Sequence, residues 1–203
     1  MTHKTLYEKR IQERSTLRFL LGLIPRLKQY IYFSYTRYIA RRRGAIVGKD
    51  VTMPLSFAKR VNSNLIIGNN VSIARGVNFS SFRYKCIIGN NVIIGTNVRF
   101  VMGSHNIDSE EWEHVRKGSE ELIIEDYVWI CPDSTILPSV KIIGRGAVVG
   151  ACSVVCKDVE EMLVVGGNPA TPLRYRKCVH TDLVIESLLS GDLKKYWSVR
   201  YHQ

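Results

Sequence analysis

The side chains best suited to proton transfer gather in one polar stretch of the chain. His105 opens this stretch, and Asp108, Trp112 and His114 follow within nine residues. An imidazole with an ordinary pKa of about 6.5 can accept a proton at neutral pH, so a histidine here could act as a general base. A polar excursion of this length from a regular scaffold is uncommon as a mere connection and usually carries function. An ordinary surface-loop histidine is the alternative interpretation.

The segments on both sides of this stretch follow a six-residue period. In four runs of three positions each, an apolar residue returns at every sixth position and is followed in most cases by Gly or another small residue. The four runs are Ile67, Ile73 and Phe79; Ile88, Ile94 and Phe100; Ile124, Ile130 and Ile136; and Ile143, Val149 and Val155. A short fixed period of this kind indicates a solenoid. Three steps close one triangular coil, and the strands of stacked coils pair about 4.8 Å apart. Gly and Asn near the corners tolerate positive φ. We therefore predict an all-β solenoid, a parallel β-helix, because residues six apart do not share one face of an α-helix.

The charge of the chain is concentrated outside the predicted coils. The 203 residues carry a net charge of +11, of which residues 1–43 contribute +9, residues 44–173 contribute −1 and residues 174–203 contribute +3. A polyanionic partner would therefore meet the N-terminal arm first. Nucleic acid is not expected as that partner, since no nucleic-acid-binding motif is present.

Residues 1–44 form the first predicted segment, a basic, amphipathic helical arm. Leu17, Leu20, Leu21 and Ile24 have helical spacing, and Pro25 is expected to break or restart the helix. Two roles stay open: the arm could cap the open end of the solenoid, or it could make a peripheral membrane contact through basic residues interleaved with aromatic and aliphatic ones. No signal peptide and no apolar run long enough to span a bilayer are apparent.

Two further segments complete the predicted organisation. Residues 45–170 form the β-helix, with an excursion loop over residues 106–122, and residues 171–203 form an extension. Thr181 or Asp182 is expected to cap a short C-terminal helix that runs to Leu189. The five cysteines do not form an even framework, so we expect reduced thiols that act as small apolar fillers.

The last coils carry a more specific signal. The chain reads Asp-Tyr-Val-Trp-Ile, Thr-Ile-Leu-Pro-Ser-Val and Gly-Ala-Val-Val-Gly-Ala-Cys-Ser-Val-Val-Cys-Lys-Asp-Val between Ile124 and Arg174, and Val-Gly-Gly-Asn-Pro-Ala follows within the same block. This block resembles the hexapeptide-repeat acetyltransferases, in particular the branch with galactoside, maltose, nodulation-factor, streptogramin and polysaccharide acetyltransferases. The resemblance implies a left-handed β-helix, a homotrimer with active sites between neighbouring subunits, acetyl-CoA as the co-substrate and no metal.

The resemblance also assigns expected roles on the acceptor side. His105 ends a coil just before the protruding loop, where the family carries its catalytic general base. The position of Asp108 in the excursion, rather than the resemblance, suggests that it orients the imidazole or binds the acceptor; a solvated loop carboxylate is the alternative. Trp112 lies in the same excursion and is expected to contact the acceptor. Asn78 corresponds to the acceptor-side asparagine of the family within one residue of spacing.

On the donor side, the resemblance implies four residues that bind acetyl-CoA. The Ala151 backbone would hydrogen-bond the pantetheine arm, and Trp129 would line the channel. Lys157 and Arg174 match basic positions near the nucleotide phosphates, where a cation offsets negative charge. The chain departs from the common pattern because Cys131 and Cys152 replace glycine and Cys156 replaces threonine.

These observations predict an O-acetyltransferase that moves the acetyl group of acetyl-CoA to a sugar hydroxyl of a bacterial polysaccharide or glycolipid precursor. The expected location is cytoplasmic, at the inner face of the membrane. Alternatives are a streptogramin-type antibiotic acetyltransferase and a non-catalytic β-helix binding module. A γ-carbonic-anhydrase-type enzyme would need three convergent histidines, whereas only His105 and His114 lie near each other in the chain.

Overall fold

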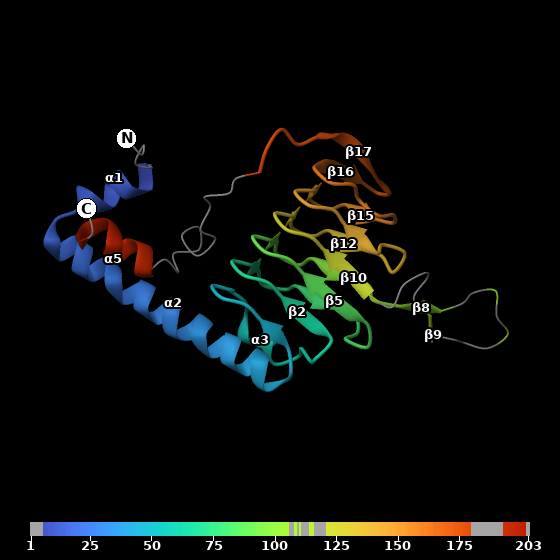
Figure 1. Ribbon diagram of the computed structural model, residues 1–203, viewed down its shortest axis with the longest axis horizontal. Helices are drawn as coiled ribbons and strands as arrows, with labels where there is room; N and C mark the ends of the chain where they lie inside the picture. The colour runs from blue at the N-terminus through green and yellow to red at the C-terminus, as the bar shows by residue number, and fades with distance from the viewer. Residues whose placement is uncertain are drawn as a thin grey trace.

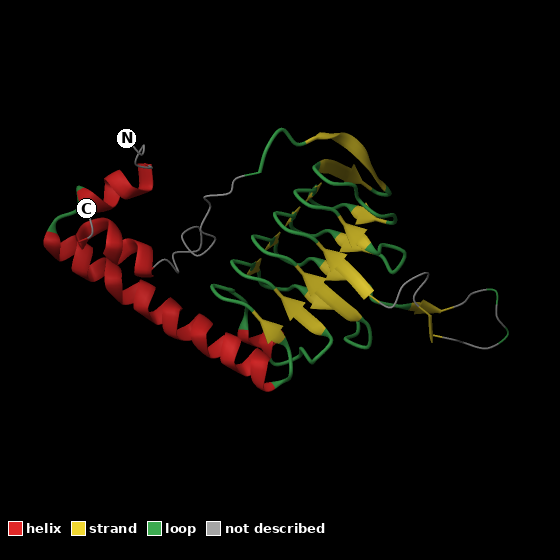
Figure 2. Cartoon of the chain, in the orientation of Figure 1, coloured by secondary structure: helices red, strands yellow, loops and turns green. Residues whose placement is uncertain are grey.

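The computed structural model of the chain is a stack of triangular coils with helices at one end (Figure 1). It describes residues 6–105, 108, 110, 114–115, 121–179 and 193–201. Short strands separated by turns form three sheets along the sides of the stack (Figure 2). Every pairing within these three sheets is parallel except the last, between β16 and β17. The predicted parallel β-sheet solenoid with an N-terminal helix is therefore confirmed.

The three sheets are called A, B and C here. Sheet A contains β1 (Ile46–Val47), β2 (Leu65–Ile67), β5 (Lys85–Ile88), β10 (Glu121–Ile124) and β13 (Ile142–Ile143). Sheet B contains β3 (Ser72–Ile73), β6 (Ile93–Ile94), β11 (Trp129–Ile130), β14 (Val148–Val149), β16 (Leu163–Gly167) and β17 (Ala170–Tyr175). Sheet C contains β4 (Asn78–Phe79), β7 (Arg99–Phe100), β12 (Thr135–Ile136) and β15 (Val154–Val155). The chain visits A, B and C in turn, so each full turn adds one coil.

The shaft of the stack is filled by the residues that define the six-residue period. All twelve periodic positions are buried, from Ile67 in the second coil to Val155 in the fifth. The aromatic members stack on one another inside the shaft, since the ring centroids of Phe79 and Phe100 lie 4.3 Å apart with an interplanar angle of 11°. Burial of one apolar side chain per step supplies the main driving force for coil formation.

The corners are held by residues in the left-handed region and by ladders of side-chain hydrogen bonds. Asn70, Asn91 and Asn97 have φ between 56° and 58°, as the Asn-rich pattern predicts. Between sheets A and B, the Asn69 N–H donates to Asn90 Oδ1 at 2.8 Å, and the Asn90 N–H donates to Asp126 Oδ1 at 2.6 Å. The corners between sheets A and B are thus bonded from one coil to the next.

The N-terminal arm contains α1 (Leu6–Gln12) and α2 (Thr16–Arg42). The expectation that Pro25 breaks the helix is wrong, because α2 runs through it as one helix of 27 residues. A proline removes one backbone donor and need not end a helix that is held by tertiary packing. Here the Arg26 guanidinium donates to the Gly22 carbonyl at 2.8 Å and lies over the Tyr196 ring, 3.8 Å from its centroid. Burial lowers the pKa of Arg26.

The C-terminal half of α2 covers the first coil, which also contains the short helix α3 (Leu55–Ala58). Ala40 is fully buried in the core of the coils. The Arg37 and Arg41 guanidinium groups donate to backbone carbonyls of this coil, at 2.9 Å to Val51 and 2.8 Å to Val47. This half therefore acts as the cap that one interpretation of the sequence predicted.

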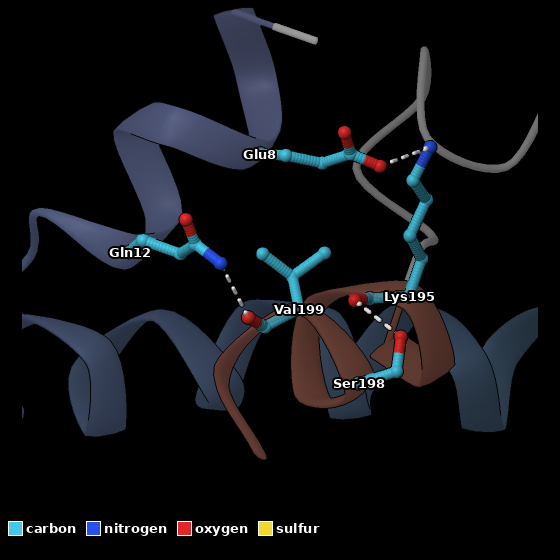
Figure 3. A network of polar contacts seen from close by, with 5 residues as sticks. All are labelled: Glu8, Gln12, Lys195, Ser198 and Val199. Atoms are coloured by element: carbon cyan, nitrogen blue, oxygen red, sulfur yellow. Dashed lines mark hydrogen bonds and ion pairs between the residues drawn. The ribbon is translucent and has the colours of Figure 1, made fainter. Parts of the chain in front are cut away.

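The N-terminal half of α2 extends away from the coils and holds α1 and α5 (Leu193–Tyr201) (Figure 1). The rings of Phe19 and Tyr196 are stacked with centroids 4.7 Å apart, and the Tyr196 hydroxyl donates to the Phe19 carbonyl at 3.1 Å. Figure 3 shows the polar contacts between α1 and α5, among them an ion pair of Lys195 and Glu8 at 3.5 Å. The sequence did not predict α5, and the helix expected from Thr181 or Asp182 to Leu189 lies outside the described residues.

The outer face of sheet A is a row of isoleucines in register. Ile46, Ile66, Ile87, Ile123 and Ile142 are successive partners across its five strands. Ile46 is 61% exposed and Ile142 is 40% exposed. The coils therefore present a continuous apolar strip on one side.

No helix within the described ranges is both long and apolar enough to cross a bilayer.

Candidate active site

The polar excursion leaves the coils at the corner between sheets C and A. The Val101 N–H still bonds the Ile136 carbonyl at 2.9 Å, and the Met102 N–H donates to Ser80 Oγ at 2.9 Å. The chain then enters a short antiparallel hairpin of β8 (Ser104–His105) and β9 (His114–Val115) that projects from the coils (Figure 1). It returns at β10, where Lys85 and Glu121 form an ion pair of 3.9 Å.

His105 is an exposed residue on this hairpin, and the register places His114 directly opposite it. The sequence placed His105 at the end of a coil and His114 in the excursion loop that follows, but the structure places His105 on a strand of the hairpin itself. Asp108 lies exposed in the turn that follows, whereas Trp112 lies outside the described residues. The hairpin therefore holds the His105 imidazole outside the packed core.

Lys157 lies on the same corner as the hairpin, two coils further along the stack. It follows β15 in sheet C and is exposed. One coil lies between the hairpin and Lys157. This coil is hydrogen-bonded to the coil of Lys157, because Ser139 Oγ donates to the Cys156 carbonyl at 2.6 Å. Because successive coils are about 4.8 Å apart, Lys157 is offset along the axis by about 10 Å from the coil that carries His105.

Trp129 and Ala151 belong to a different side of the stack. Trp129 lies on the outer face of sheet B, is 45% exposed and has Ile93 and Val148 as strand partners. Ala151 is exposed at the corner between sheets B and C. Within the described part of the chain, no hydrogen-bond acceptor is seen for the Ala151 N–H. A flat apolar face next to a corner with an open backbone donor suits an amphipathic chain such as pantetheine.

Arg174 is exposed on β17, at the end of sheet B. Its guanidinium donates to the Tyr175 carbonyl at 3.2 Å. The Tyr175 hydroxyl donates to Glu160 Oε2 at 2.8 Å, and this hydrogen bond raises the pKa of Tyr175. Arg174 therefore remains available at the surface as a cation for an anionic ligand.

Asn78 lies on β4, on the outer face of sheet C. Its side-chain oxygen accepts a hydrogen bond from Arg60, and its strand partner is Arg99. The sequence did not single out Arg60, because this residue falls in a stretch that departs from the six-residue period. Asn78 thus lies among cations of its own chain.

The cysteines fill different environments. Cys86 is buried in the core, as expected of a small apolar filler, and burial raises the pKa of the half-buried Cys131 thiol. Cys152 is exposed, with φ of 57° at the corner between sheets B and C, so it is not a core filler. In the described residues, no group of three or more His, Cys, Asp or Glu side chains gathers in a way that could hold a metal ion.

The predicted site residues therefore form two groups in one chain. His105 and Lys157 share the corner between C and A, whereas Trp129 and Ala151 lie on sheet B and at its corner with C. The width of sheet C separates the two groups. Neither group alone contains both an exposed imidazole and the open backbone donor.

Comparisons with known proteins agree with the fold. No family model matches the chain. The chain is 35% identical over 130 residues to a chloramphenicol acetyltransferase of Klebsiella aerogenes, an alignment that covers 62% of this chain and 56% of that protein. It is 28% identical over 146 residues to WcaF of Escherichia coli strain K12, whose name assigns it provisionally to colanic acid biosynthesis as an acetyltransferase; this alignment covers 72% and 78% of the two proteins. The chain spans about half the length of the first curated relatives that it matches.

A solved structure covers more of the chain. A hexapeptide-repeat acetyltransferase of Vibrio cholerae, crystallised with acetyl coenzyme A, superposes with a TM-score of 0.53 at 27% identity and covers 81% of this chain and 92% of that protein. The stacked six-residue coils agree with these similarities in sequence and structure. In sequence and in fold, this chain is thus similar to a hexapeptide-repeat acetyltransferase.

Proposed function

We propose that the protein is an O-acetyltransferase that moves the acetyl group of acetyl-CoA to a sugar hydroxyl of a bacterial polysaccharide or glycolipid precursor. The observation that carries this proposal is the exposed position of His105 on a hairpin that leaves the corner of the coils. The Vibrio cholerae structure with acetyl coenzyme A supports the choice of donor, and the alignment with WcaF over most of both chains supports a glycan acceptor.

In the proposed reaction, the His105 imidazole takes the proton of the acceptor hydroxyl as its oxygen attacks the thioester carbonyl. A carbon–oxygen bond forms, the carbon–sulfur bond breaks, and the imidazolium returns the proton to the departing CoA thiolate. Asp108 orients the imidazole or binds the acceptor, and Trp112 and Asn78 contact the acceptor. Positioned proton transfer of this kind contributes about 10²–10⁴-fold to the rate.

The donor is proposed to lie along the side of the coils where Trp129 and Ala151 are exposed. The Ala151 N–H would donate to a carbonyl of the pantetheine arm, and the Trp129 ring would cover its apolar segment. Arg174, at the end of the same sheet, would pair with the nucleotide phosphates, which carry several negative charges. Lys157 lies across sheet C from these residues, so its proposed contact with the phosphates would come from the neighbouring subunit. These four residues fit the donor because they offer an open N–H, a flat apolar face and two surface cations.

The donor roles can be tested with two acetyl donors. Lys157→Ala and Arg174→Ala are expected to raise KM for acetyl-CoA but to have little effect with acetyl-pantetheine, which lacks the nucleotide phosphates. Lys59→Ala, at an exposed lysine of the first coil, is the matched control and should change neither KM. Equal KM effects on both donors would contradict phosphate binding by these residues.

The active site is proposed to form between neighbouring subunits of a homotrimer of left-handed β-helices. This arrangement explains why one chain holds His105 and Ala151 on different sides of its coils. The isoleucine row of sheet A, with Ile46 61% exposed, offers an apolar strip that a neighbouring subunit could cover. The left hand of the coils and the trimer are proposed from the resemblance to the hexapeptide-repeat acetyltransferases.

Subunit mixing tests the shared site directly. His105→Ala and Ala151→Pro subunits should each be inactive alone, since one lacks the base and the other lacks the backbone donor. Mixed trimers contain interfaces with an intact His105 from one subunit and an intact Ala151 from the next, so activity should reappear. Mixed oligomers verified by mass measurement that remain inactive would contradict a site between subunits.

An antibiotic hydroxyl is the second candidate acceptor. The same chemistry would apply, and the identity of 35% with the Klebsiella chloramphenicol acetyltransferase favours testing it. Purified protein and acetyl-CoA should be incubated with bacterial glycan precursors, a streptogramin and chloramphenicol, and the products examined for the mass of one added acetyl group. We expect acetylation of a glycan; acetylation of only the antibiotics would reassign the acceptor, and a lack of transfer to any of them would overturn the proposed function.

A cytoplasmic location at the inner face of the membrane is proposed with this function, because lipid-linked glycans are assembled there. Antibody labelling of fractionated cells tests the location. Recovery of the native protein mainly in the periplasmic fraction would contradict it.

A further inference from the structure

The two halves of α2 are placed to do different work. The C-terminal half packs on the first coil through Ala40 and is hydrogen-bonded to it through Arg37 and Arg41. The N-terminal half projects beyond the coils and forms a separate three-helix unit with α1 and α5 (Figure 1). This unit has its own small core of Ile11, Phe19 and Tyr196. We call it the helical unit, and its surface is not needed to close the solenoid.

A long apolar row lies exposed on α2. Its members are each between 48% and 68% exposed and recur three, four or seven positions apart: Leu17, Leu20, Leu21, Ile24, Leu27, Ile31, Tyr35 and Tyr38. Residues with this spacing lie on one face of a helix. A contiguous exposed apolar surface of this kind usually marks a contact with a partner or a membrane.

An apolar groove continues the row between α2 and α5. It has a volume of about 490 Å³ and is lined by Leu23 and Leu27 of α2 and by Leu193, Lys194, Trp197 and Ser198 of α5. Leu27 belongs to both the row and the groove, so the two features form one apolar surface. The stacking of Tyr196 on Phe19 and the ion pair of Lys195 with Glu8, which Figure 3 shows, hold α5 in place beside the groove.

The charge on α2 and α5 has one sign. No Asp or Glu occurs between Glu13 and Asp50, and α5 contains none either. Lys28 and Lys194 are exposed beside the row and the groove. Trp197 is 45% exposed and Tyr201 is 54% exposed on α5. Basic residues attract an anionic membrane surface, and Trp and Tyr favour the membrane–water interface.

A second copy of the chain is the rival partner, since a row with three- and four-residue spacing could also form a coiled coil. Two such rows would bring together flanks that carry only positive charge, and like charges at the flanks of a coiled coil oppose pairing. An anionic lipid surface satisfies the row and the lysines together. Charge complementarity therefore selects the lipid.

We propose that the helical unit is a binding site for an anionic phospholipid membrane, in which the α2 row lies in the interface and the groove beside Trp197 receives part of one acyl chain. At this site the α2 row and the groove of the N-terminal arm would contact the membrane. Membrane binding at this site does not depend on acetyl transfer. Its role would be to hold the coils, and the substrate hairpin, near a bilayer.

Sedimentation of the full-length protein with vesicles tests the proposal. The protein should sediment with vesicles of phosphatidylglycerol and phosphatidylcholine but not with pure phosphatidylcholine, and less at high salt. The double variant Ile24→Ser/Leu27→Ser should lower the partition coefficient about tenfold or more, because two apolar contacts are lost. Leu173→Ser, at a leucine on β17 that is 64% exposed, is the matched control and should partition like the wild type.

Charge and groove occupancy are tested separately. Lys28→Glu/Lys194→Glu should lower the partition coefficient about tenfold or more, whereas the matched pair Lys59→Glu/Lys141→Glu on the coils should lower it much less. In a chain with Trp112→Phe and Trp129→Phe, phosphatidylglycerol brominated on its acyl chains should quench the fluorescence of Trp197.

Several results would overturn the lipid site. These are equal sedimentation with neutral and anionic vesicles, no sedimentation at all, and no quenching of Trp197 by brominated lipid. A loss of oligomer mass in Ile24→Ser/Leu27→Ser without a change in vesicle binding would assign the row to a second copy instead. Each of these outcomes is independent of whether the enzyme transfers acetyl groups.

Discussion

Truncation of Phe100 to alanine should destabilise the protein strongly, because this side chain fills the shaft just before the chain turns toward His105. Phe100 is 1% exposed, and its ring stacks on that of Phe79 with centroids 4.3 Å apart. Removing a buried Phe side chain costs about 3–5 kcal/mol, and a stacked pair accounts for about 0.5–1.5 kcal/mol of such a loss. Coils in a solenoid contact only their neighbours, so little compensation is expected from elsewhere.

We therefore expect the free energy of unfolding to fall by about 3–5 kcal/mol in Phe100→Ala. Urea unfolding followed by circular dichroism measures it, with all samples at one protein concentration because oligomers gain stability with concentration. Leu173→Ala, on the exposed face of β17, is the control and should change the free energy by less than about 0.5 kcal/mol. A loss below about 1 kcal/mol in Phe100→Ala would refute the stacked shaft as the source of stability.

One labelling experiment and two substitutions test the corners and the cap. Iodoacetamide should modify the exposed Cys152 well before Cys131, whose raised thiol pKa leaves less thiolate at neutral pH; peptide mass spectrometry gives the order, and equal rates would contradict it. Arg41→Ala should lower the free energy of unfolding by about 1–2 kcal/mol, because three hydrogen bonds to carbonyls of the first coil are lost. Arg42→Ala is the control and should have little effect. A larger loss in Arg42→Ala than in Arg41→Ala, measured by urea unfolding, would argue against the cap. Gly76→Ala should cost about 1 kcal/mol or more, because Gly76 has φ of +74° at a crowded corner; an unchanged melting temperature would exclude strain there.

The periodic part of the chain could be predicted from the sequence because its information is local. Each six-residue step places one apolar side chain in the shaft, so Ile67, Phe100 and Val155 were assigned to the core without any knowledge of distant contacts. The same pattern marked the excursion around His105, since a break in a strict period is visible in the sequence itself. That residue lies on a hairpin outside the packed coils.

The helices could be predicted only in part because their structure depends on distant segments. Pro25 suggested a break, but the packing of Tyr196 against Phe19, 177 residues earlier in the chain, stabilises one continuous helix. No local sequence pattern predicts the contact between Tyr196 and Phe19. Cys152 was expected to be a core filler like Cys86, but its corner position exposes it. The bond of Arg60 to Asn78 likewise joins two segments whose spacing does not follow the period.

The proton-accepting role of His105 is tested most directly by the turnover number of His105→Ala with acetyl-CoA and the acceptor found in the glycan panel. We expect kcat to fall by about 10²–10⁴-fold while calorimetry shows unchanged affinity for CoA, because the imidazole moves a proton and does not hold the donor. His3→Ala, which removes an imidazole far from the hairpin in sequence, should keep the activity of the wild type. A fall of kcat by less than about tenfold in His105→Ala would contradict general-base catalysis by this residue.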